Sequence, residues 1–77
     1  MRSTRHQRII RMINFLCEEF RMTQGDVAKL LDRSDATVSG LLRHEPGNSR
    51  LYELALERAV QLKCGETMKR AAEVLEQ

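Results

Sequence analysis

Apolar residues recur every three or four positions along most of this chain, which is the spacing of a helix with one buried face. This pattern predicts a first helix over residues 5–20. Its apolar stripe consists of Ile9, Ile13, Leu16 and Phe20, with Met12 and Cys17 beside it. No segment shows the strict alternation of apolar and polar residues that is typical of a half-buried strand. The pattern therefore predicts an all-α protein.

Two short helices are expected next, each with its own start signal. The first is predicted over residues 24–31, because Thr23 and Asp26 have the spacing of a capping box. The second is predicted over residues 35–43, with Ser34 as its N-cap. The residues expected on the inward faces are Val27, Ala28, Leu30, Leu31, Val38, Leu41 and Leu42.

The C-terminal part predicts two more helices after a loop at residues 44–48 that contains proline and glycine. Ser49 is expected to cap a fourth helix over residues 50–64. Gly65 stands where a glycine commonly ends a helix, and a last helix is expected over residues 67–75. The expected fold is a compact bundle of about five short helices.

Length and composition indicate one domain, residues 1–77, with a small core. Cys17 and Cys64 lack the spacing of a metal site or a disulfide framework, so we expect buried, reduced thiols and a cytoplasmic protein. No signal peptide or long apolar run is present, so neither secretion nor membrane insertion is expected.

The formal net charge of +2 is unevenly distributed. Residues 1–11 contain four arginines and no acidic residue, whereas residues 50–77 contain five basic and five acidic residues. The arginines are Arg2, Arg5, Arg8 and Arg11. They could be a solvated helix face, or they could form an arm or extend a grip on phosphate.

The segment 23–43 resembles the helix-turn-helix of the phage repressor and Cro family. Gln24 stands where that family usually has a glutamine at the start of its first motif helix. Ala28 matches the small residue that lets the two helices cross closely, and Val38 and Leu41 match the apolar anchors of the recognition helix.

Two further positions bear on this resemblance. The run Thr37-Val38-Ser39 is similar to a frequent sequence of the family's recognition helix. The turn position that is commonly glycine in the family is Asp32 here. Aspartate tolerates a left-handed backbone better than most residues, so we expect the turn to be retained.

The resemblance implies that residues 35–43 form a recognition helix for the major groove of DNA. Asp35, Ala36, Ser39 and Gly40 would face the base edges, and residues at the edges of the motif would contact phosphates. Arg43 could instead bind a guanine. The full set of candidate DNA-binding residues is Gln24, Arg33, Ser34, Asp35, Ala36, Thr37, Ser39, Gly40, Arg43, His44 and Arg50.

Two of these positions have open alternatives. The Asp35 carboxylate could accept a hydrogen bond from a cytosine amino group, or it could complement the positive N-terminus of its own helix. Gly40 lies inside a helix, where glycine costs about 1 kcal/mol relative to alanine. Either a close approach to DNA explains this glycine, or the helix tolerates it.

The fourth predicted helix has an apolar arc wider than a single buried face requires. These residues are Leu51, Leu54, Ala55, Leu56, Ala59, Val60 and Leu62, and the last helix adds Met68, Ala71, Ala72 and Leu75. The arc could complete a small core, or residues 50–64 and 67–75 could form the seam of a homodimer. A dimer is expected because one recognition helix reads few bases, and a two-fold dimer reads two half-sites.

No catalytic or cofactor-binding pattern is present. His6 and His44 are too isolated for a metal site, and no nucleophile set or glycine-rich phosphate loop occurs. We therefore expect no enzyme activity, no cofactor, no metal and no small-molecule ligand.

These observations lead to one main hypothesis, a sequence-specific regulator that binds double-stranded DNA. We expect a repressor of phage or mobile-element type that binds a palindromic operator as a homodimer. Two alternatives are a protein-binding adaptor or antitoxin built on the same scaffold, and an accessory protein that bends DNA.

Overall fold

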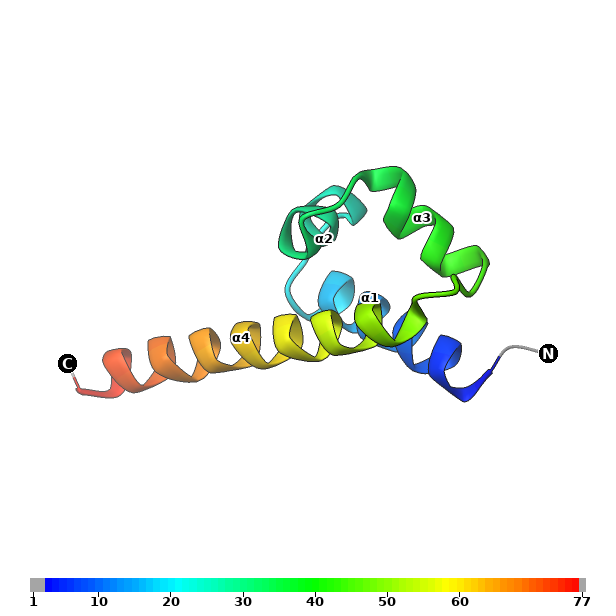
Figure 1. Ribbon diagram of the computed structural model, residues 1–77. Helices are drawn as coiled ribbons and strands as arrows, with labels where there is room; N and C mark the ends of the chain where they lie inside the picture. The colour runs from blue at the N-terminus through cyan, green and yellow to red at the C-terminus, as the bar shows by residue number, and fades with distance from the viewer. Residues whose placement is uncertain (1–2, 77) are drawn as a thin grey trace.

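Helices account for all regular structure in the described part of the chain (Figure 1). The computed structural model describes the backbone of residues 3–76 and the side chains of residues 3–65. Its helices are α1 (Thr4–Glu19), α2 (Gln24–Leu31), α3 (Asp35–Arg43) and α4 (Ser49–Glu76). The predicted all-α class is therefore confirmed.

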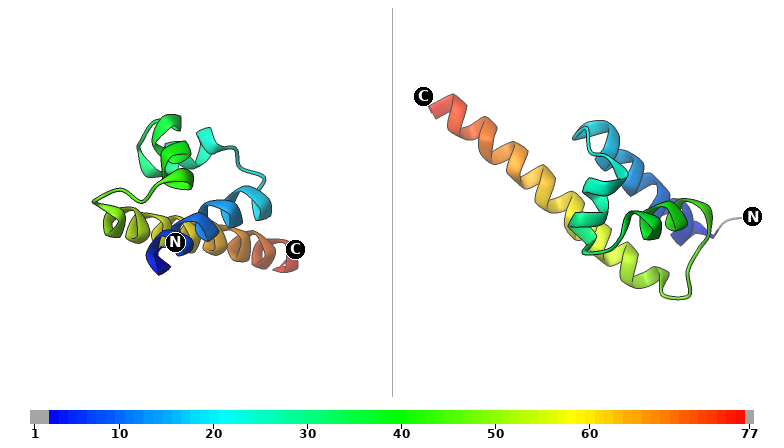
Figure 2. Two further views of the ribbon diagram at one scale, coloured as in Figure 1. Left: turned by 90° about the vertical axis from the view of Figure 1, so that its right-hand side faces the viewer. Right: turned by 90° about the horizontal axis from the view of Figure 1, so that it is seen from above.

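The four helices share one core. α1 and the first half of α4 pack against each other, and α2 and α3 lie together on one side of this pair (Figures 1 and 2). The buried apolar residues are Ile9, Ile13, Leu16, Val27, Ala28, Val38, Leu41, Leu56 and Ala59. The second half of α4 extends past the other three helices (Figure 2).

Local capping explains where α2 and α3 begin, and both helices have their predicted bounds. The backbone N–H of Asp26 donates to Thr23 Oγ1 over 3.1 Å, and the N–H of Thr23 donates to Asp26 Oδ2 over 3.0 Å. Ser34 Oγ accepts from the N–H of Thr37 over 3.3 Å at the start of α3. The predicted capping box and N-cap are therefore confirmed.

The capping box makes part of the stability depend on pH. Hydrogen bonds from Thr23, chiefly from its backbone N–H, hold the pKa of Asp26 below its ordinary value. A carboxyl group with a lowered pKa stabilises the fold above its unfolded pKa, about 3.9, and this contribution is lost as the pH falls. We expect the free energy of unfolding to decrease below about pH 4.

The Asp26→Asn variant isolates this contribution, because asparagine can still accept the Thr23 hydrogen bond but does not titrate. Urea unfolding of both proteins between pH 7 and pH 3 should show a shallower acid-side decrease for Asp26→Asn. Parallel pH profiles would show that the Asp26 carboxylate does not contribute to acid sensitivity.

The prediction of separate helices over residues 50–64 and 67–75 is wrong, because α4 continues through Gly65 to Glu76. A glycine that ends a helix adopts a left-handed conformation, and no described glycine has a positive φ angle. The residues after Gly65 are mainly good helix formers, and no proline follows. The side chains predicted to form an apolar face over residues 67–75 lie outside the described residues.

Ser49 does not cap α4 as predicted, since it is the first residue of that helix. Its backbone N–H donates to the carbonyl of Pro46 over 3.2 Å, and its hydroxyl donates to Glu45 Oε1 over 3.5 Å. The hydroxyl of Ser3, the N-cap of α1, donates to the same carboxylate over 2.6 Å to Oε2 and 2.7 Å to Oε1. Glu45 therefore joins the starts of α1 and α4 to the loop that follows α3.

Leu30 was predicted to face inward, but 40 % of it is exposed. The fully buried residues of α2 are Val27 and Ala28, and Leu31 packs partly against them. A helix turns by about 100° per residue, which places Leu30 roughly 100° from the middle of that face. A helix of eight residues between one core and solvent buries only one such face.

The turn between α2 and α3 has a left-handed residue that is aspartate and not glycine. Asp32 has a left-handed backbone with φ 56° and ψ 46°, as the sequence predicted. The N–H of Arg33 donates to the carbonyl of Ala28 over 2.9 Å, and the N–H of Asp32 donates to that of Lys29 over 3.2 Å. These bonds satisfy carbonyls that the end of α2 leaves free, so the turn holds α3 at a defined angle to α2.

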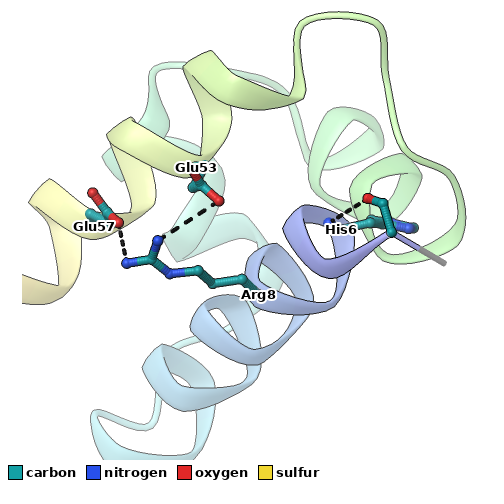
Figure 3. A network of polar contacts seen from close by, with 5 residues as sticks. His6, Arg8, Glu53 and Glu57 are labelled. Atoms are coloured by element: carbon teal, nitrogen blue, oxygen red, sulfur yellow. Dashed lines mark hydrogen bonds and ion pairs between the residues drawn. The ribbon is translucent and has the colours of Figure 1, made fainter.

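His6 fixes the other end of α3. Its side chain is almost fully buried, and Nε2 lies 2.7 Å from the carbonyl oxygen of Leu41 (its position on α1 is seen in Figure 3). That carbonyl belongs to the last turn of α3, where a helix has no backbone donor of its own. The imidazole N–H therefore links α1 to the C-terminal end of α3.

Candidate nucleic-acid interface

The outward face of α3 is the most distinctive surface of the protein. Val38 and Leu41 are 0 % and 2 % exposed, so they anchor the helix in the core. Asp35, Ala36 and Arg43 are exposed, and Ser39 and Gly40 are partly exposed. The predicted orientation, with aliphatic residues inward and small or polar residues outward, is confirmed.

The first turn of α3 uses two of the candidate hydroxyl groups for its own structure. Ser34 Oγ and Thr37 Oγ1 lie 3.1 Å apart and share a hydrogen bond, in addition to the cap bond from Thr37 N–H. Ser34 is exposed and Thr37 is partly buried. These two hydroxyl groups therefore stabilise the start of α3 within the protein itself, without a bound partner.

Asp35 lies close to the starts of two helices. A Cβ atom added to Gly25, in the first turn of α2, would be 3.4 Å and 3.5 Å from the two carboxylate oxygens of Asp35. Asp35 is also the first residue of α3. Helix N-termini carry partial positive charge, which favours a negatively charged side chain at this position. The contact of Asp35 with cytosine stays a prediction.

Exposed basic residues lie around the outward face of α3. Arg43 and His44 follow one another at its C-terminal end, Arg33 precedes it in the turn, and Arg50 lies in the first turn of α4. Arg33 Nη1 donates to the carbonyl of Asp32 over 3.1 Å. Within residues 3–65, no ion pair involves Arg33, Arg43 or Arg50. Gln24, the first residue of α2, is also exposed.

The N-terminal arginines do not all belong to this surface. Arg8 pairs with Glu57 and, at 3.8 Å, with Glu53, both on α4 (Figure 3). Its charge is therefore neutralised between α1 and α4. Arg5 and Arg11 are exposed on α1, and Arg2 lies outside the described residues.

A hollow that sequence reasoning missed lies beside the outward face of α3. It is open to solvent and has a volume of about 240 Å³. Its lining consists of Thr37, Gly40, Leu41, His44, Pro46 and Tyr52. Pro46 and Tyr52 were not among the candidate residues, because only the packing of the loop and α4 beside α3 brings them there.

Comparisons of this chain with protein-family models, with curated proteins and with solved structures found no match.

The described residues show neither a metal site nor a membrane-spanning helix. No group of three or more histidine, cysteine or acidic residues there is arranged to hold a metal ion. No helix in that part of the chain combines the length and the apolar character needed to cross a membrane.

Cys17 and Cys64 are free thiols, but both are partly exposed and not fully buried as expected. Burial raises the pKa of the Cys17 thiol, with smaller contributions from Glu18 and Asp26.

Proposed function

We propose that α2 and α3 form a helix-turn-helix and that this protein is a sequence-specific regulator that binds double-stranded DNA. The observation that carries the proposal is the outward face of α3. It is small and polar, it is anchored in the core by Val38 and Leu41, and arginines that form no ion pair within residues 3–65 flank it. α3 has nine residues and is therefore about 14 Å long. An α-helix with its side chains is about 10–12 Å across, which fits a major groove about 12 Å wide.

Basic residues lie towards both ends of α3, where they could contact the two strands that border a major groove. Arg33 lies at the N-terminal end of the helix, and Arg43, His44 and Arg50 lie at or beyond its C-terminal end. Contacts from such residues to phosphates position a protein on DNA, and contacts in the groove select the sequence. Ser39 and Arg43 are the candidates for base contacts, because both are polar and lie on the same side of α3.

We propose that the protein acts as a homodimer through α4. Leu51, Leu54 and Leu62 are 65 %, 49 % and 58 % exposed, although the core of one copy is already filled. A two-fold dimer would cover these side chains and place two α3 helices on half-sites about 34 Å apart. Binding over a promoter would then block polymerase and make the protein a repressor. The phage or mobile-element type is what the resemblance of residues 23–43 implies.

Selection from random duplexes tests this proposal directly. We expect the full-length protein to enrich a palindromic site and to bind it as two copies per duplex, with a dimer visible by sedimentation at micromolar concentration. The logarithm of affinity should fall with the logarithm of salt concentration by about 0.9 for each phosphate contact. Failure to enrich any site would contradict sequence-specific binding, and one copy per duplex would contradict the dimer.

A second candidate function is that of an adaptor or antitoxin that binds a partner protein. The exposed leucines of α4 favour it, because they also fit an apolar protein surface. This function predicts binding to a protein with little salt dependence and no enriched DNA site, so the same selection separates the two.

A further inference from the structure

The hollow beside α3 is continuous with the face that we propose to enter the major groove. Gly40 belongs to both, since it is partly exposed on α3 and lines the hollow. The rest of the lining consists of Leu41, Pro46 and Tyr52 together with Thr37 and His44, and most of its surface is apolar. Such a lining favours contact with an apolar group of a partner over contact with a charged one.

The fold does not require glycine at position 40. A Cβ atom added there would have no neighbour within 4 Å. Gly40 has no positive φ angle, so its backbone is open to any L residue. Alanine should therefore be accepted and should favour the helix. What glycine provides is space at the junction of the hollow and the outward face of α3.

We propose that this hollow receives the 5-methyl group of a thymine and makes Gly40 a determinant of specificity. The inference rests on the proposed binding of DNA. The thymine methyl is the apolar group that B-DNA presents in the major groove, where the other base-edge groups are hydrogen-bond donors and acceptors. An exposed cation lies next to the hollow in the chain, because Arg43 directly precedes the lining residue His44. A polyanion carrying apolar methyl groups complements both features.

Ala36 is the competing site for a thymine methyl, since it is also small and exposed on α3. It lies in the first turn of α3 and does not line the hollow. At Ala36 a methyl would meet one side chain on an open surface. The hollow, by contrast, offers contacts from α3, the following loop and α4 at once.

Deoxyuridine provides the test, because it pairs like thymidine and lacks only the 5-methyl group. Each thymine of the selected duplex is replaced in turn, and affinity is measured with the full-length protein and with Gly40→Ala. With the unmodified protein, one position in each half-site should lose about four-fold in affinity, the value of one buried methyl group. With Gly40→Ala, affinity for the thymine duplex should fall and the difference between thymine and uracil at that position should vanish.

Two controls make the result specific. Thermal unfolding of Gly40→Ala should show a midpoint equal to or higher than that of the unmodified protein, which excludes a folding defect. Ala36→Gly should bind more weakly or equally but should keep the preference for thymine at the same position.

The possible outcomes separate this inference from the proposed function. If the protein binds a selected duplex but no single uracil lowers affinity, the hollow does not read a methyl group, although DNA binding stands. Retention of the thymine preference in Gly40→Ala, or its loss in Ala36→Gly, also overturns the assignment. If no duplex is bound at all, the proposed function itself fails.

Discussion

Val38→Asp should unfold the protein at room temperature. Val38 is 0 % exposed and lies in the core cluster with Ile9, Ile13 and Leu56. The substitution removes about 2 kcal/mol of apolar burial and places an unpaired carboxylate in the core, at a cost of several kcal/mol. A domain of this length has a total free energy of unfolding of about 4–12 kcal/mol. The two losses are large enough to remove most or all of that stability.

Circular dichroism and urea unfolding measure this effect, and Ala36→Asp is the matched control on the same helix. Ala36 is exposed and lies in the first turn of α3, where a negative charge is favourable. Ala36→Asp should therefore remain folded while it weakens DNA binding by repulsion. A folded Val38→Asp protein with unchanged stability would mean that the inward face of α3 has been assigned incorrectly.

Arg43→Ala should weaken binding to the selected duplex by about 5- to 150-fold, which corresponds to about 1–3 kcal/mol. Arg43 is exposed at the C-terminal end of α3, and no described residue forms an ion pair with it. An arginine there can donate two hydrogen bonds to the O6 and N7 atoms of a guanine. The loss should be accompanied by relaxed preference at one base position in each half-site.

Two further variants define the role of this side chain. Arg43→Lys keeps the charge but cannot form the paired hydrogen bonds, so it should also relax the base preference. Arg11→Ala removes an equal charge from the exposed side of α1 and should leave affinity nearly unchanged. A uniform loss over all sequences, with a salt slope smaller by about one, would show that Arg43 contacts phosphate and not guanine.

The helix pair at the centre of the candidate site was predictable because its determinants are local. Thr23, Asp26 and Ser34 satisfy backbone groups within three residues of themselves. Asp32 adopts a left-handed conformation through its own short side chain and backbone. Such features act over one turn of chain, so the sequence alone predicts them well.

Other features were not predictable, because they depend on what packs nearby. Gly65 is compatible with a helix end and with a helix interior, and the chain continues straight through it. Leu30 has helical spacing but lies beside the buried face of α2. The buried bond of His6 to the carbonyl of Leu41 joins residues far apart in the chain, and no local pattern indicates it.

By itself, the sequence determined the all-helical class, the bounds and caps of α2 and α3, and which side of α3 faces the core. These features follow from hydrogen bonds and apolar spacing within each helix. Tertiary structure alone decided that Arg8 pairs with Glu57 and Glu53 of α4, that Asp35 lies beside the start of α2, and that Tyr52 and Pro46 line an open hollow together with Gly40. The physical reason is that ion pairs and cavities depend on distances between separate helices. Those distances are set only when the shared core is packed.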